Sequence, residues 1–162
     1  STAATLNLAA VAAQGARIWG KIDPAFAAKC LDAARRAFAA AERNPEVYAA
    51  TAFTGSGGYG DGDVSDEFFW AAAELFATTG DPAYRSALAR SPHWDAAPTR
   101  EPGWSGTATL GTITLATLPG LDSAIGNHER ARLTALADRF LAERDRAGYR
   151  LPYGGAREDH RE

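Results

Sequence analysis

The sequence predicts an all-α protein, and three observations support this. Almost half of its 162 residues are apolar (46%), many of them alanine, the strongest helix former. Apolar residues recur at helical spacing along several segments. Two predicted helices begin with matching segments, Asp23-Pro24-Ala25-Phe26 and Asp81-Pro82-Ala83-Tyr84, in which Asp is the N-cap and Pro the first helical residue. This repeat predicts helical hairpins whose outer members begin with Asp-Pro.

The first two predicted helices span residues 3–19 and 24–43, and Asn44-Pro45 ends the second. The first has Leu6, Ala10, Ala13 and Arg17 at helical spacing, and its apolar face is expected to be widened by Leu8, Val11 and Ile18. The second is expected to bury Phe26, Cys30, Leu31, Ala34 and Phe38. Trp19, Phe68, Phe69, Trp70 and Phe76 lie at core-like spacing, so packing is the expected role of these aromatic side chains.

Four further helices complete the predicted fold. The third begins at Asp63 or Val64 and ends at Thr79, with Gly80 as its C-terminal cap. The fourth begins at Pro82, and residues 91–106 form a loop rich in Pro and Trp. The fifth spans residues 107–118, although its β-branched residues would by themselves permit a strand. The sixth runs from about residue 122 to residue 147.

Charge and composition exclude several classes of function. The net charge of -3 and the scattered arginines do not provide the concentrated basic face that a nucleic-acid partner requires. No apolar run approaches the roughly 20 residues of a membrane span, and the first residues lack the pattern of a signal peptide. The only cysteine, Cys30, cannot form an internal disulfide. The histidines, His93, His128 and His160, are too dispersed to predict a metal-ligand pattern.

The most informative segment is an acidic, glycine-rich loop followed by an aromatic helix. Its four carboxylates lie within seven positions: Asp61, Asp63, Asp66 and Glu67. Because glycines let the backbone fold tightly, this loop is suited to hold a hard cation or to hydrogen-bond a polyol. An EF-hand is excluded, since Asp66 occupies its glycine position and Ala72 its bidentate Glu position.

Four segments of the chain resemble glycoside hydrolase family 9, the inverting cellulases built as a barrel of paired helices. The resemblance lies in residues 62–81 (GDVSDEFFWAAAELFATTGD), 2–19 (TAATLNLAAVAAQGARIW), 91–94 (SPHW) and 110–116 (LGTITLA), which occur in family order. It implies that the fifth segment is a helix. Six helices in three hairpins would then form about half of an (α/α)6 barrel, with residues 1–153 as a partial module and residues 154–162 as a polar tail.

The resemblance also implies that the chain lacks the family's chemistry. An inverting glycosidase needs two carboxyl groups roughly 6.5–9.5 Å apart, one as acid and one as base. The family's Asp-Ala-Gly-Asp and His-His-Arg motifs are absent, so no catalytic residue is assigned. We expect a central part of an endoglucanase or cellobiohydrolase acting on β-1,4-glucan, and expect the chain by itself to be inactive. The alternative is a non-catalytic helical module for self-association or carbohydrate binding.

By the same resemblance, no cofactor is required, but a structural Ca²⁺ site is implied. Its side-chain ligands would be Asp66 and Glu67, and its carbonyl ligands would come from near Gly62 and Asp63. The family's further Asp falls near Gly106, so binding is expected to be weak or absent. The other interpretation, left open, is helix capping, with Asp63 as N-cap and Asp66 as the third helical residue.

Substrate contacts are assigned to Tyr59, Asp61, Trp104 and Trp94, because aromatic faces stack on glucose rings and carboxylates bind their hydroxyls. Tyr59 and Trp104 lie near family positions that line the cleft, while Trp94 is interpreted as either a sugar contact or a loop residue. His93 is interpreted as a loop histidine with a satisfied hydrogen bond, with substrate binding as the alternative, and His128 and His160 are expected to be surface residues.

A half barrel has open edges, which predicts two kinds of partner besides cello-oligosaccharide: another copy of the chain in a homo-oligomer, or the remainder of a parent module. The parent is expected to be secreted, with its export signal upstream of this segment. No nucleic-acid or membrane partner is expected.

Overall fold

The computed structural model describes residues 1–49, 61–99, 101–103, 106–121 and 123–152. Within these ranges the fold is all-α, as predicted, and its helices are α1 (Thr2–Trp19), α2 (Pro24–Arg43), α3 (Ser65–Thr79), α4 (Pro82–Arg90), α5 (Ala108–Thr117) and α6 (Ser123–Arg146). Among the described residues no helix is both long and apolar enough to span a membrane.

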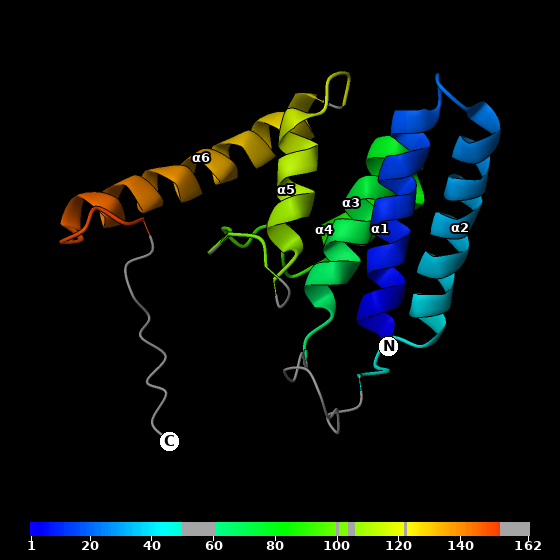
Figure 1. Cartoon of the computed structure of the whole chain (residues 1–162), viewed down its shortest axis with the longest axis horizontal. Coiled ribbons are helices and arrows are strands. Elements are labelled where there is room, and N and C mark those ends of the chain that lie inside the picture. Colours follow the sequence, from blue (N-terminus) through cyan, green and yellow to red (C-terminus); the bar gives the residue numbers. More distant parts are fainter. Residues whose placement is uncertain (50–60, 100, 104–105, 122, 153–162) are drawn as a thin grey trace.

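Three helices form an inner row, and each carries an outer helix on its flank. The inner helices α1, α3 and α5 contact one another in that order, while α2 packs on α1, α4 on α3 and α6 on α5. Figure 1 shows α1 and α2 side by side at one end of the molecule, with α6 reaching away from α5 toward the other end. This is the predicted arrangement of three hairpins.

The predicted starts of α2 and α4 and the predicted end of α3 agree with the structure, because the capping residues there function as expected. Asp23 Oδ1 accepts from the N–H of Phe26, and Asp81 Oδ1 accepts from the N–H of Ala83, so both Asp-Pro signatures begin helices. Gly80 ends α3 with a φ of 68°, a left-handed conformation that glycine adopts without strain. The helix interpretation of residues 107–118 is confirmed as well.

Leu8, Val11 and Ile18, which were predicted to widen the apolar face of α1, lie on a part of that face that is exposed. Their side chains are 51%, 50% and 59% exposed, whereas the opposite side of α1 is buried. The physical reason is that apolar residues occupy more of the surface of α1 than α2 and α3 cover among the described residues. A periodic pattern identifies apolar faces but does not say which of them another element covers.

Two aromatic residues expected in the core lie instead at the turn between α1 and α2. Trp19 is 41% exposed and Phe26 is 45% exposed. Their rings meet edge to face, with centroids 5.6 Å apart and planes at 85°. The other predicted aromatic positions are core residues or pack against the core: Phe38, Phe69 and Phe76 are buried, and Phe68 and Trp70 are partly buried against them.

A buried carboxylate joins the three inner helices. Glu74, on α3, has no exposed surface, and its Oε2 lies 2.7 Å from the Arg17 guanidinium of α1. Its Oε1 accepts from the Thr114 hydroxyl of α5 at 2.6 Å and from the Trp70 indole at 3.4 Å. Because an unpaired buried charge is costly, this network favours one register of the three helices. The sequence pattern placed Arg17 inward but gave no indication of its partner.

Candidate functional site

The start of α3 brings three acidic side chains together. Asp66 and Glu67 occupy its first turn, and Asp61 precedes it. Each of the three offers one carboxylate oxygen, and these oxygens lie within 4.8 Å of one another. Asp66 is 6% exposed and Glu67 only 1%, so these two members of the acidic cluster are buried, while Asp61 is partly exposed. Such a group of oxygen ligands could hold a metal ion.

The acidic cluster concentrates negative charge in a buried place. Burial, together with repulsion from the carboxylates of Asp66 and Asp61, raises the pKa of Glu67 to about 8. Glu67 Oε2 and Asp61 Oδ2 are buried and have no hydrogen-bond partner among the residues that the structure describes. Since buried polar atoms are normally paired, the two oxygens fit a site in which a cation supplies the missing contact.

The predicted ligand set differs in part from this cluster. Asp66 and Glu67 come together as expected, but the third carboxylate is Asp61, which the sequence had assigned to substrate. Whether the carbonyls of Gly62 and Asp63 act as ligands stays a prediction. The glycine at position 106 brings no carboxylate.

The predicted capping geometry at α3 is wrong in its details. Val64 is the N-cap, without a side-chain cap, and Asp63 lies one residue earlier. Asp63 Oδ1 nevertheless accepts from the N–H of Ser65 at 2.9 Å. Hydrogen bonds from the Ser65 hydroxyl and N–H lower the pKa of Asp63. Asp66 is the second residue of α3, not the third as predicted. Its carboxylate accepts from the N–H of Thr107.

Thr107 connects the acidic cluster to the start of α5. Its N–H donates to Asp66 Oδ2 at 2.6 Å, and its hydroxyl lies 3.2 Å from the same oxygen. Both residues are buried. A carboxylate of α3 thus accepts from the first backbone group of α5.

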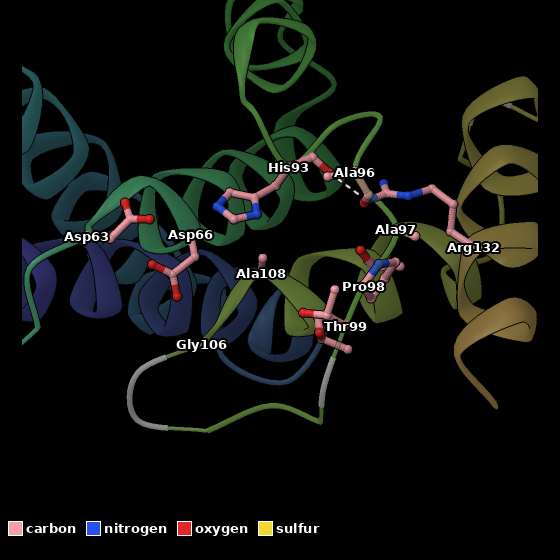
Figure 2. Close-up of a pocket in the computed structure, with 12 residues that line it drawn as sticks. Asp63, Asp66, His93, Ala96, Ala97, Pro98, Thr99, Gly106, Ala108 and Arg132 are labelled. Atoms are coloured by element: carbon pink, nitrogen blue, oxygen red, sulfur yellow. Dashed lines mark hydrogen bonds between the residues drawn. The ribbon is translucent and has the colours of Figure 1, made fainter. Parts of the chain in front are cut away.

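A polar cavity of about 190 Å³ lies beside this connection. Figure 2 shows its walls, which come from the start of α3, the start of α5, the segment 93–99 and Arg132 of α6. The polar side chains among them are Asp63, Asp66, His93, Thr99, Thr109, Thr112 and Arg132. His93 is partly buried, with Nε2 2.9 Å from Ser65 Oγ, so its expected hydrogen bond is confirmed. The cavity offers hydrogen-bond donors and acceptors in a volume suited to a small polar group or ordered water.

Arg132 fixes the segment that forms one wall of the cavity. Its guanidinium pairs with Glu129 at 2.7 Å and donates to the carbonyls of His93, at 2.6 Å, and Ala96. Glu129 has no exposed surface. The sequence prediction missed both residues, although their spacing of three along a helix is typical of an ion pair.

The sugar-contact candidates have different outcomes. Tyr59 and Trp104 lie outside the described residues. Trp94 is partly buried against the core and stacks on His128, with ring centroids 5.2 Å apart and planes at 29°. One face of the indole is therefore occupied, which favours packing as its role. His128 is not a simple surface residue, since its Nδ1 also lies 3.1 Å from Glu129 Oε1.

Comparison with known proteins identifies a single family along the chain. The family model described as Glycosyl hydrolase family 9 matches residues 1–154. A cellulose 1,4-beta-cellobiosidase of Acetivibrio thermocellus is 41% identical over 180 aligned residues, which cover 98% of this chain and 20% of that protein. Endoglucanase C of Cellulomonas fimi is 50% identical over 131 residues, covering 76% of this chain and 12% of the relative.

The structural comparison agrees with the sequence comparison. The crystal structure of a family 9 endoglucanase, J30, superposes with a TM-score of 0.80 at 35% identity, covering 93% of this chain and 28% of that one. The six helices therefore match part of an (α/α)6 barrel catalytic domain. The chain spans about a fifth or less of the length of the two relatives above.

Proposed function

Because the chain belongs to glycosyl hydrolase family 9, we propose that it forms part of a module that cleaves β-1,4-glucan, and that it supplies a wall of the substrate cleft. The observation that supports this most is the polar cavity at the starts of α3 and α5, which lies within residues 1–154, the range that the family model matches. The names of the relatives, a cellobiosidase and an endoglucanase, support the substrate class. A parent protein acting on such a polymer would be secreted.

We propose further that this segment does not supply the catalytic acid and base. The oxygens of the acidic cluster lie within 4.8 Å of one another, closer than the roughly 6.5–9.5 Å of an inverting pair. Asp66 lines the polar cavity, but its Oδ2 is held by two hydrogen bonds from Thr107. Glu67 is only 1% exposed and does not line the cavity, so it is too enclosed to reach a glycosidic oxygen or a catalytic water. The raised pKa of Glu67 follows from this burial and does not require a catalytic role.

Incubation with cellohexaose tests both parts of the proposal. Chemical-shift changes at the amides that line the cavity, without new reducing ends, are the expected result. Release of shorter oligosaccharides would contradict the non-catalytic assignment. The control is Asp66→Asn, because hydrolysis by this chain that the substitution abolished would place the chemistry in the acidic cluster. If cellohexaose leaves every cavity amide unchanged, the cleft-wall proposal is wrong.

The acidic cluster is proposed to bind Ca²⁺, with Asp61, Asp66 and Glu67 as carboxylate ligands. Asp61 provides the third carboxylate that Gly106 does not, and calcium affinity depends on the number of carboxylates. The ion would neutralise a buried negative charge and stabilise the fold, since a ligand bound only by the folded state raises stability by mass action. Gly106→Asp should strengthen calcium binding in a calorimetric titration. If neither wild type nor this variant binds calcium, the cation site is wrong.

The exposed stripe of α1 favours a second function, association through the open edge of the half barrel. Leu8, Val11 and Ile18 form an apolar surface along an inner helix, a position that is enclosed in a closed barrel. Either another copy of the chain or the remainder of a family 9 module would cover it. Light scattering of the isolated chain should show a species larger than the monomer, and Val11→Asp should reduce it. The matched control is Ala28→Asp at an exposed position of α2. A monomer that binds no apolar dye would contradict this proposal.

A further inference from the structure

The start of α5 depends on a side chain from another helix. Thr107 is the N-cap of α5, but its side chain makes no cap hydrogen bond within the helix. Both of its donors, the N–H and the hydroxyl, go to Asp66 Oδ2 of α3 instead. Further along α5, Gly111 packs so closely on α3 that an added Cβ would lie 3.0 Å from the Phe69 ring. Packing therefore fixes the middle of α5, and a single carboxylate holds its beginning.

The same carboxylate belongs to the acidic cluster. One oxygen of Asp66 accepts from Thr107, and a carboxylate has a second oxygen that can contact a cation. Without a cation, the Asp66 carboxylate lies beside the carboxyl groups of Asp61 and Glu67, and like charges there repel one another. The same side chain also accepts the hydrogen bonds from Thr107. A bound cation would remove the repulsion and fix the orientation of the carboxylate. The cluster and the start of α5 therefore cannot change independently.

We propose that Asp66 is a positioning residue that couples cation binding to the start of α5 and, through it, to the wall of the polar cavity. This inference rests on the proposed cation site. Gly106 and Ala108 line the cavity on either side of Thr107. Gly106 also exchanges two backbone hydrogen bonds with Gly103, at 3.1 and 3.2 Å, so the residue before Thr107 is itself held in place.

Amide hydrogen exchange of the whole chain, measured by NMR during a calcium titration, tests the coupling. The protection of the Thr107 amide should rise at least about tenfold in parallel with calcium occupancy measured by calorimetry, a size typical of coupling between two sites. Asp61→Asn, which alters the cluster without touching Thr107, should require more calcium but reach the same protection at saturation. Asp66→Asn should show no calcium-dependent rise.

Reciprocity provides a second test that does not depend on an Asp66 variant remaining folded. If calcium strengthens the Thr107 contact, weakening that contact must weaken calcium binding. Thr107→Val keeps the shape of the side chain but removes the hydroxyl donor, and should lower calcium affinity about fivefold. The matched control is Thr117→Val at the other end of α5. It removes a hydroxyl that donates to the Ile113 carbonyl of the same helix, and it should leave the affinity unchanged.

The outcomes separate the coupling from the site itself. Calcium binding with an unchanged Thr107 amide, or a Thr107→Val affinity equal to that of Thr117→Val, would overturn the coupling and leave the cation site standing. A fall in Thr107 protection on binding would overturn it as well, since the cation would then be pulling Asp66 away. If no variant binds calcium, both the site and the coupling are wrong.

Discussion

Glu67→Gln should make the stability of the metal-free protein less dependent on pH. The folded-state pKa of Glu67 is raised to about 8 from an ordinary value of 4.5, so between these values the folded state holds a proton that the unfolded state has lost. The stabilising contribution is complete below pH 4.5 and is lost as pH rises through about 8. Each pH unit in this interval costs at most about 1.4 kcal/mol. From about pH 5.5 to about pH 7.5, wild type should lose up to about 2.7 kcal/mol of unfolding free energy through this group.

Urea unfolding in the presence of a chelator, at several pH values, measures this loss. The glutamine side chain has nearly the same shape but does not titrate, so its variant should lack the loss due to position 67. Glu46→Gln, at an exposed position, is the matched control and should follow wild type. Saturating calcium should flatten the wild-type curve, because a metal ligand is held deprotonated. Equal pH dependence of wild type and Glu67→Gln would refute the argument that burial and neighbouring charge control this carboxyl.

Three further predictions concern the packing and capping that support the site. Gly111→Ala should destabilise the fold by about 1–3 kcal/mol, because its Cβ would lie 3.0 Å from an aromatic ring of α3, whereas Gly15→Ala meets its nearest atom at 3.6 Å and should stabilise by roughly 0.4–1 kcal/mol. Urea unfolding compares them, and equal effects would show that the helices are less closely packed than described. Glu74→Ala should cost about 3 kcal/mol by leaving Arg17 without its charged partner, and a loss below about 1 kcal/mol would contradict the buried network. Asp63→Ala should cost about 0.5–2 kcal/mol in thermal unfolding by removing an acceptor at the start of α3, and an unchanged melting temperature would exclude that role.

The helices were predictable from the sequence because local chemistry determines where they begin and end. The Asp-Pro signatures and Gly80 set their boundaries through hydrogen bonds and backbone conformation within a few residues. The exposed stripe of α1 was not predictable, because Leu8 and Val11 follow the same helical periodicity as buried positions. Only the arrangement of neighbouring helices decides which apolar face is covered.

The candidate site was predictable in part. Asp66 and Glu67 were expected as ligands because the resemblance to glycoside hydrolase family 9 implies a Ca²⁺ site at an acidic pair that begins the corresponding helix. The third member, Asp61, joins them only through the path of the loop, which residue spacing does not determine. The contact of Asp66 with Thr107 crosses 41 positions, and no local pattern indicates it. Ion pairs between helices, such as that of Glu74 with Arg17, are missed on the same grounds.

Thermal unfolding with and without millimolar calcium, in wild type and in Asp66→Asn, tests most directly the central claim that the buried carboxylates form a cation site and not a catalytic pair. At a calcium concentration about a hundred times the dissociation constant, the wild type should gain about 2.7 kcal/mol and melt at a higher temperature. Asp66→Asn should show little or no gain. Identical melting temperatures of wild type in calcium and in chelator would contradict the claim.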